Sequence, residues 1–414
     1  MTRHAQKLAV LKIWLCLLGC HVCWQTSLLA QGLPRVSPES VGFDVAKLGE
    51  IQGLVTVAIE AGKLPGCVVA VGHRGRLVFL QSFGRRQVEP VPLPMTVETV
   101  FDLASLTKPV ATATCMMRLV EQGRVSLTGR VSNYCPEFGA RGKEELTLFD
   151  LLTHQSGLIA DNPLSDYQGG SVEAWKNICD LPLQSPARTR FIYSDVNFIA
   201  LGKVIEAVSG RSLADFSQQE IFEPLGMCST RFCPPTEWSD RIAPTGKRDG
   251  HWIIGEVHDP RAHLMGGVAG HAGLFSNAED LAIYAQMLIN GGTCNDRRIL
   301  SENSVTQMTR GYMVPTSPNI GNPLLSSEPR TDAGTLRGLG WDRQSRYSHN
   351  RGQGWSMTAF GHGGFTGTVL WIDPERELFY LLLSNRLHPT GKGEVNKLAG
   401  QIGTLIIEAM PRPD

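Results

Sequence analysis

The feature of the sequence with the clearest chemical potential is the run Ser105-Leu106-Thr107-Lys108. Residues three apart share one face of a helix, so a helical run would place the Lys108 amine beside the Ser105 hydroxyl. A serine hydroxyl becomes a strong nucleophile only when a base takes its proton, and a nearby lysine can take it or orient a second base. Exposed N–H groups at a helix start would favour a developing oxyanion. The spacing is equally typical of a serine cap followed by a surface lysine, so it needs support from elsewhere.

Two later runs supply that support, because they follow in a fixed order. They are Tyr193-Ser194-Asp195 and the glycine-rich run His362-Gly363-Gly364-Phe365. This order of motifs resembles the serine β-lactamase and penicillin-binding-protein superfamily, specifically its class C-like branch. The resemblance extends over about residues 38–410, and it is strengthened by the runs at 151–158 (LLTHQSGL), 222–227 (FEPLGM) and 267–274 (GVAGHAGL).

The resemblance implies a serine hydrolase that works through an acyl-enzyme. Ser105 would be the acylated nucleophile and Lys108 its proton partner. Tyr193 would be the general base, with a phenol pKa lowered from about 10 by the Lys108 ammonium. The implied fold class is α+β, with an antiparallel sheet flanked by helices and a mainly helical subdomain, and with the site in the cleft between them.

The third run is expected to bind the substrate. His362 would stand where many relatives have the lysine of Lys-Thr-Gly. Gly364 would lie beside the substrate, and the backbone N–H groups of Ser105 and Phe365 would form the oxyanion hole. Histidine is cationic for only part of the time near neutral pH, so this exchange disfavours efficient β-lactam hydrolysis and favours ester or peptide substrates.

The sequence departs from the class C-like branch a second time at Asp195, because asparagine is usual at this position. An ionised aspartate accepts hydrogen bonds but donates none. Two roles follow for this residue, and the sequence favours neither. Asp195 either recognises an amine or ammonium group of the substrate or holds Lys108 in a salt bridge.

The predicted activity is therefore cleavage of a carboxylic ester or a cell-wall-derived amide. A class C-type β-lactamase or a DD-peptidase is the alternative within the superfamily, and a non-catalytic sensor of wall peptides is the alternative outside enzymes. No cofactor is expected. No metal is expected either, since His258-Asp259, His263 and His271 have spacings that fit no common ligand motif.

The elements that must position these residues can be read from apolar runs. Runs at 67–71 and 77–80, separated by a turn, predict one hairpin, and runs at 368–372 and 378–383 predict another. Two hairpins at opposite ends of the chain suggest one sheet built from both termini. Helices are predicted at residues 41–61, 103–122, 146–153, 196–208, 281–288 and 398–409. Residues 312–352, rich in Pro, Gly, Ser and Asn, predict a long surface excursion.

Composition sets outer limits on function. The formal net charge is zero, which gives no support for nucleic-acid binding. Residues 1–30 combine Arg3, Lys7 and Lys12 with a short apolar stretch, which predicts a secretory signal peptide. A lipoprotein leader, with a cleavage box at Leu17-Leu18-Gly19-Cys20, and an uncleaved membrane anchor are the alternatives, and all three predict an exported protein, periplasmic or extracellular. Seven cysteines follow the leader, of which Cys228 and Cys233 could pair in an oxidising compartment.

Overall fold

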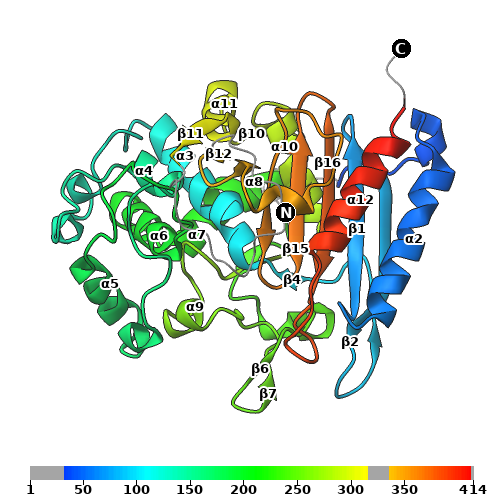
Figure 1. The fold of residues 1–414 in the computed structure, drawn as a ribbon, viewed down its shortest axis with the longest axis horizontal. Helices are drawn as coiled ribbons and strands as arrows, with labels where there is room; N and C mark the ends of the chain where they lie inside the picture. Colours follow the sequence, from blue (N-terminus) through cyan, green and yellow to red (C-terminus); the bar gives the residue numbers. More distant parts are fainter. Residues whose placement is uncertain (1–31, 316–334, 412–414) are drawn as a thin grey trace, which may run out of the picture. The chain divides into compact units, whose positions relative to one another are not determined.

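The computed structural model describes residues 32–315 and 335–411 (Figure 1). The predicted leader at residues 1–30 lies outside the described residues, so signal peptide, lipoprotein leader and anchor all stay predictions. In the described part of the chain, no helix is both long and apolar enough to cross a membrane.

A nine-stranded antiparallel sheet forms the centre of the fold, in the order β11-β12-β13-β14-β15-β16-β1-β2-β3. Its strands are β1 (Gly66–His73), β2 (Arg76–Gln87), β3 (Leu93–Pro94), β11 (Tyr312–Val314), β12 (Thr335–Arg337), β13 (Asp342–Gln344), β14 (Phe360–Gly364), β15 (Thr368–Asp373) and β16 (Leu378–Ser384). Three small sheets lie outside it, formed by β4 (Phe101–Asp102) with β5 (Arg231–Phe232) and β8 (Leu274–Ser276), by β6 (Lys247–Arg248) with β7 (His251–Trp252), and by β9 (Thr293–Cys294) with β10 (Arg297–Arg298).

The two predicted hairpins are confirmed, and they meet in the middle of the sheet. β1 is buried along its whole length, as its unbroken apolar run predicts. The turn to β2 uses Arg74 and Gly75, both with positive φ. β1 then pairs with β16 in antiparallel register from Cys67 opposite Ser384 to His73 opposite Leu378. The first and last hairpins of the chain therefore share one seam.

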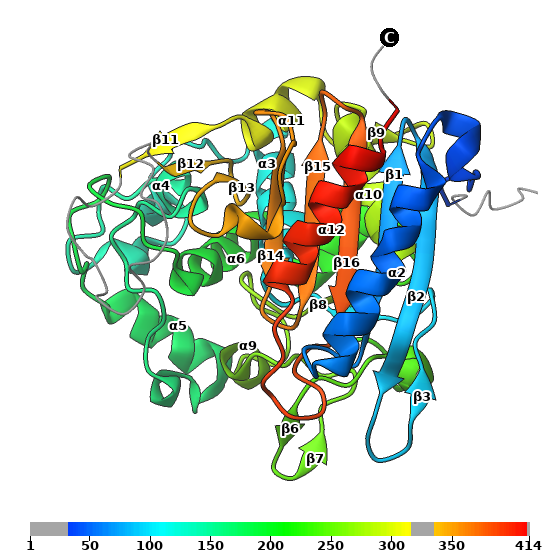
Figure 2. The same ribbon diagram turned by 45° about the vertical axis from the view of Figure 1, so that its right-hand side comes forward.

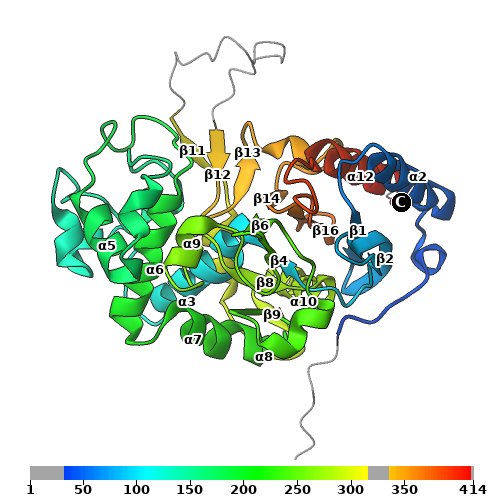
Figure 3. The same ribbon diagram turned by 90° about the horizontal axis from the view of Figure 1, so that it is seen from below.

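Helices from the two termini cover one face of the sheet. α2 (Val45–Glu60) and α12 (Asn396–Ala409) lie side by side across it (Figures 2 and 3). Ile51 and Val55 of α2 and Ile402 of α12 belong to the apolar core between these helices and the strands. The helices predicted at 41–61 and 398–409 are thus confirmed with small shifts at their ends.

The opposite face is covered by α10 (Ala278–Ile289), which packs on β1, β15 and β16 (Figure 3). Beyond it lies the helical part of the fold, which joins the same large core. Its helices are α3 (Thr114–Glu121), α4 (Leu148–Leu152), α5 (Gly170–Asp180), α6 (Asp195–Ser209), α7 (Leu213–Ser217), α8 (Glu223–Leu225), α9 (Pro260–Leu264) and α11 (Glu302–Thr309). The α+β architecture with a mainly helical subdomain is confirmed.

Three expectations need correction. The single helix predicted at 103–122 is a 3-10 turn at Ala104–Leu106, a π-helix at Lys108–Ala113 and then α3. Pro109 contributes to this break, because proline has no N–H to donate within a helix. The segment at 312–352 is not a surface excursion throughout, since its described ends form β11, β12 and β13. Cys228 and Cys233 are free and exposed thiols.

Candidate active site

Ser105 lies on a strained turn whose conformation is fixed by hydrogen bonds to a buried carboxylate. Ala104, immediately before it, has a φ of 45°. Few residues with a side chain adopt this conformation, and it persists only where the surroundings impose it. The Asp102 carboxylate does so by accepting the N–H groups of Ala104 at 2.8 Å and His258 at 2.6 Å. Burial raises the pKa of Asp102 to about 6, although both hydrogen bonds oppose this effect.

Strand β14 approaches the same turn from the sheet. A Cβ atom on Gly364 would lie 2.3 Å from the carbonyl oxygen of Leu103 and 2.2 Å from Oγ1 of Thr368. The hydroxyls of Thr366 and Thr368 donate to the carbonyls of Asp102 and Leu103, at 2.6 and 3.1 Å. Only glycine therefore lets β14 lie this close to the Ser105 turn.

Lys108 is fully buried behind Ser105 and is surrounded by oxygen atoms. Its Nζ lies 3.0 Å from Ser105 Oγ, 3.1 Å from the carbonyl oxygen of His271 and 2.6 Å from Asp195 Oδ1. Burial lowers the pKa of Lys108, but the charge of Asp195 and the Tyr193 phenol outweigh it, so the net pKa shift is upward. Asp195 thus holds Lys108, the second of its two predicted roles, and contact with a substrate ammonium stays a prediction.

Tyr193 lies against Lys108, with Nζ 5.0 Å from the centre of its ring. The predicted fall in the pKa of its phenol is wrong in direction. Burial raises this pKa above 10, and the Asp195 carboxylate raises it further, while Lys108 and Ser105 lower it only in part. The sequence showed the cation beside Tyr193 but neither the burial of its phenol nor the position of Asp195.

His362 is buried on β14, with Nδ1 2.8 Å from the carbonyl oxygen of Gly363. Burial lowers the pKa of His362 well below its usual value, and the charges of Arg337 and Lys108 add to this effect. The imidazole is therefore neutral near pH 7, so it does not replace the positive charge of a lysine.

A cavity of about 340 Å³ brings most of the predicted residues together. Ser105, Tyr193, His362, Gly364 and Phe365 all line it. Phe365 is 61% exposed at its edge. Lys108 does not line the cavity, and Asp195 lines a neighbouring cavity on the other side of Tyr193. The cavity thus brings together the candidate nucleophile Ser105, the candidate base Tyr193 and the substrate-binding strand β14. Lys108 lies directly behind Ser105.

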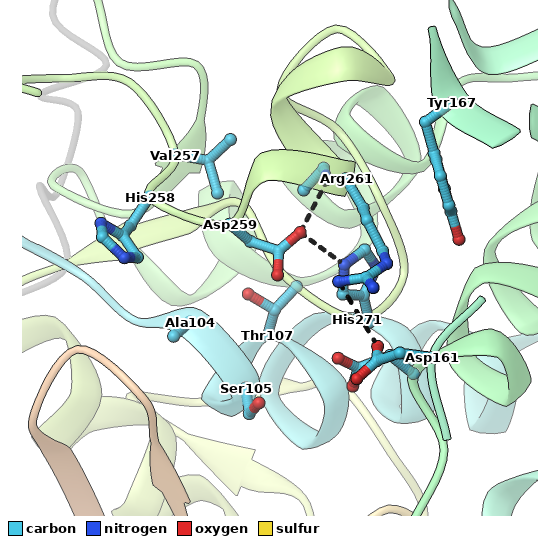
Figure 4. Close-up of polar contacts among 12 residues, drawn as sticks. Ala104, Ser105, Thr107, Asp161, Tyr167, Val257, His258, Asp259, Arg261 and His271 are labelled. Carbon is cyan, nitrogen blue, oxygen red and sulfur yellow. Dashed lines mark hydrogen bonds and ion pairs between the residues drawn. The ribbon is translucent and has the colours of Figure 1, made fainter. Parts of the chain in front are cut away.

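The histidine-rich loop lies beside this place, although its spacings gave no motif. Figure 4 shows the Asp259 carboxylate between His271 and the start of α9, with an interaction to each. Asp259 Oδ1 lies 3.0 Å from His271 Nε2 and accepts the N–H of Ala262. Oxygen or nitrogen atoms of Asp195, Asp259 and His271 all lie within 4.8 Å of one another. Lys108 already neutralises Asp195, so a metal ion at this cluster would have to compete with the ammonium group.

Sequence reasoning missed three residues that shape the site. Asp102 fixes the turn before Ser105, the carbonyl oxygen of His271 accepts from Lys108, and Arg337 lines the cavity from β12. Asp102 stands three residues before Ser105, where an aspartate that caps a turn could have been suspected. His271 lies in the run at 267–274 that supported the resemblance, but its contact with Lys108, like the place of Arg337 in the cavity, depends on how distant segments pack together.

Comparison with known families decides the relationship. The family model described as Beta-lactamase matches residues 51–403. The chain belongs to the Beta-lactamase family. An N-acetylmuramyl-L-alanine amidase of Bacillus subtilis is 31% identical over 390 residues, which cover 85% of this chain and 84% of that protein. A protein of Salmonella gallinarum that carries the name of a D-alanyl-D-alanine carboxypeptidase is 31% identical over 402 residues, 88% of each chain.

Two solved structures share the fold of this chain. A class C beta lactamase from Rhodobacter sphaeroides has a TM-score of 0.67 and 22% identity, over 87% of this chain and 99% of that one. A penicillin-binding protein homologue from Caulobacter crescentus has a TM-score of 0.67 and 19% identity, over 89% and 99%. The predicted family and fold are confirmed, and membership supports a hydrolase activity for this chain.

Proposed function

We propose that this member of the Beta-lactamase family is an exported serine hydrolase that forms an acyl-enzyme on Ser105. Its substrates are carboxylic esters or amides derived from the cell wall. The observation that carries the proposal is the 3.0 Å contact between Lys108 Nζ and Ser105 Oγ, at a cavity that Tyr193 and His362 also line. A non-catalytic sensor would need none of this arrangement.

The charges of the network support one assignment of the proton transfers. Asp195 keeps Lys108 protonated, so Lys108 donates a hydrogen bond to Ser105 Oγ and cannot take its proton. Tyr193 is then the base, in its phenolate form. Ser105 Oγ attacks the carbonyl carbon, and the N–H groups of Ser105 and Phe365 stabilise the oxyanion. The leaving group departs with a proton from Tyr193. In deacylation the Tyr193 phenolate takes a proton from a water molecule whose oxygen attacks the acyl carbon, and it passes this proton to Ser105 Oγ as the acyl–Oγ bond breaks and the acid leaves.

Two observations support wall-derived amides or esters over β-lactams. The two relatives described above carry the names of a wall amidase and a carboxypeptidase, both enzymes of amide bonds. His362 is neutral where a β-lactam carboxylate would need a cation. Export, by a cleaved signal peptide or with an N-terminal membrane attachment, is consistent with such substrates. It is tested by separating periplasmic, membrane and cytoplasmic fractions.

The deciding experiment compares residues 31–414 with and without Ser105→Ala. One substrate is a short-chain para-nitrophenyl ester, and the other is a chromogenic cephalosporin. We expect ester turnover that falls by more than a thousandfold in Ser105→Ala, as removal of a nucleophile does. Rapid turnover of the cephalosporin would instead indicate a β-lactamase. Full activity in Ser105→Ala would overturn the mechanism, and no turnover by either protein would favour the sensor.

A further inference from the structure

Asp102, the last residue of β4, has a buried carboxylate that joins two separate segments beside Ser105. Only 2% of Asp102 is exposed, and it does not line the cavity that contains Ser105. Its Oδ1 accepts the N–H of Ala104 on the Ser105 turn, and its Oδ2 accepts the N–H of His258 across 156 residues of sequence. Two distant segments therefore depend on one side chain.

The backbone of Asp102 is fixed independently of its carboxylate. Asp102 pairs with Phe275 of β8, and its carbonyl oxygen accepts the hydroxyl of Thr366 at 2.6 Å. Ala104, by contrast, has a φ of 45°, which a residue with a side chain rarely adopts without an external constraint. The carboxylate is therefore a connection through which the fixed strand holds the strained turn.

The segment that contains His258 supports the other side of the site. The His258 imidazole stacks on the ring of Phe365, with the ring centres 6.0 Å apart. The backbone N–H groups of Ser105 and Phe365 are the two donors of the proposed oxyanion hole. Asp102 thus holds the turn that carries one donor and the segment that packs against the residue that carries the other.

Only the ionised carboxylate can accept well from both N–H groups. A carboxylate accepts on both oxygens, whereas a protonated carboxyl group has a hydroxyl that donates a proton and is the poorer acceptor. One of the two buried N–H groups then loses its acceptor, which is costly where water cannot replace it. Protonation of Asp102 would therefore release either the turn at Ala104 or the segment behind Phe365.

The surroundings of Asp102 bring this protonation into the mildly acidic range. Burial raises the pKa of Asp102 to about 6, although its two hydrogen bonds oppose this effect. The Asp259 carboxylate raises this pKa further, and the Arg248 guanidinium lowers it. Burial lowers the pKa of the His258 imidazole below its usual value. β8 and the β14–β15 turn, which also pack on Asp102, contain no titratable side chain.

We propose that Asp102 is a positioning residue for Ser105 and that it acts only as a carboxylate. Ionised Asp102 keeps the Ser105 turn and the segment behind Phe365 in place, and its protonation in mild acid releases them and slows attack by Ser105. This inference rests on the proposed function and adds an acid-sensitive control to it. The hydrolase therefore loses activity in acid more steeply than protonation of Tyr193 alone explains.

The test measures how fast a fluorophosphonate labels Ser105 of the full-length protein between about pH 5 and pH 9. Labelling needs no known substrate, because Ser105 Oγ bonds to phosphorus, fluoride leaves and Tyr193 takes the hydroxyl proton. Above about pH 6 the labelling rate should rise about tenfold per pH unit, since only Tyr193 titrates. Below about pH 6 the rise should approach 100-fold per unit, since Asp102 must lose a proton as well. kcat/KM for a neutral ester should follow the same curve.

Asp102→Asn resembles the protonated side chain, because it is neutral and its amide nitrogen must face one of the two N–H groups. We expect the labelling rate and kcat/KM to fall by about 10- to 100-fold at about pH 8. The rise with pH should stay near tenfold per unit over the whole range, without the steeper part in acid.

Asp280→Asn is the matched control. Asp280 is a second buried carboxylate whose pKa burial raises to about 6, and it accepts the N–H of Ser229 and the hydroxyl of Thr230. It does not line the cavity that contains Ser105. This variant should keep both the labelling rate at about pH 8 and the change of slope near pH 6.

The unaltered protein gives a result even if no variant folds. A rise of only tenfold per unit down to about pH 5 in the wild type would overturn the inference. So would a change of slope that coincides with unfolding in near-ultraviolet circular dichroism, one that survives Asp102→Asn, or one that Asp280→Asn removes. Absence of both labelling and ester turnover in the wild type would count against the proposed function itself.

Discussion

Asp195 shows how one side chain sets the charge of a whole site. Its carboxylate lies 2.6 Å from Lys108 Nζ, and the two groups neutralise each other beside Ser105. An asparagine would accept a hydrogen bond from Lys108 without adding a negative charge. Because Asp195 raises the pKa of both Lys108 and Tyr193, it makes the phenolate form of Tyr193 harder to reach.

Asp195→Asn should therefore increase activity on the acid side of the pH profile. Removing the negative charge lowers the pKa of Tyr193, so a larger fraction of the phenolate base is present at any pH below that pKa. With the Tyr193 phenolate as base, kcat/KM of the wild type should rise with pH. In the variant this rise should move to lower pH, with a tenfold gain in kcat/KM for each pH unit by which it moves. The measurement is kcat/KM for a neutral ester between pH 6 and 10.

The direction of the shift separates the two roles of Asp195. If kcat/KM of Asp195→Asn rises at the same pH as in the wild type, and substrates that carry an ammonium group bind more weakly, Asp195 recognises the substrate. A rise that moves to higher pH would contradict Tyr193 as the base. Asp161→Asn serves as the control, because Asp161 lines the cavity beside Asp195 and has no contact with Lys108 in the described structure.

How far the sequence could predict the site depends on how local each contact is. Ser105 and Lys108 are three residues apart, so their contact could be predicted from the spacing once the order of the later motifs supported it. His362 and Phe365 could be placed only through the order of motifs in a family. Arg337 lies in a segment whose composition predicts a loop, and its place in the cavity depends on the pairing of β12 with β13. The pKa of Tyr193 depends on burial, which no motif shows.

At the scale of elements, β14 and the Ser105 turn form one unit. The hydroxyls of Thr366 and Thr368 tie the β14–β15 turn to the backbone on which Ser105 depends. Hairpins could be predicted because alternating turns and apolar runs are local. The 3-10 turn before Thr107 could not, because Ala104 is held in its unusual conformation by Asp102, which is itself fixed by the N–H of distant His258, whereas Pro109 is the one local signal of the break.

Gly364→Ala tests this unit. The new methyl group would lie 2.2 Å from Thr368 Oγ1 and 2.3 Å from the carbonyl oxygen of Leu103, so β14 and the turn must separate. We expect a loss of about 1–3 kcal/mol in the free energy of unfolding and a fall of at least about 100-fold in kcat. Thermal unfolding and ester hydrolysis measure the two effects.

Gly363→Ala is the matched neighbour on the same strand. Its methyl group would lie 2.9 Å from the side-chain amide of Asn350, whereas the nearest backbone atom, the carbonyl oxygen of Thr368, is at an ordinary contact distance of 3.7 Å. We expect a smaller loss of both stability and kcat. Equal losses in the two variants would mean that any added methyl group on β14 lowers stability and kcat. The close contact between Gly364 and the Ser105 turn would then not be the cause.

At the scale of the molecule, the site and much of the stabilising core lie on different sides of the sheet. Ile51 of α2 is completely buried between α2, α12 and the strands, whereas Val57 of the same helix is 66% exposed. Ile51→Ala should reduce the free energy of unfolding by about 2–5 kcal/mol, and Val57→Ala by less than about 0.5 kcal/mol. Denaturant titration measures both values.

Neither change should alter kcat/KM by more than about threefold at a temperature where the protein is folded. Neither residue lines the cavity, and no described cavity residue belongs to α2, although Trp371 and Val395 of the Ile51 core do line it. A large fall in kcat/KM for folded Ile51→Ala would show that packing behind the sheet controls the geometry of β14.

The seam between β1 and β16 determines when this protein can fold during its synthesis. The Ser384 hydroxyl donates to the carbonyl oxygen of Gly66 across 318 residues of sequence. The ribosome must therefore complete nearly the whole chain before β1 gains the partner on its inner side, and α12 follows later still. Until then the strands of the first hairpin remain an open edge that chaperones can hold. A polypeptide that crosses a membrane in unfolded form benefits from such a delay, because its tertiary structure closes only after the last segment has passed through.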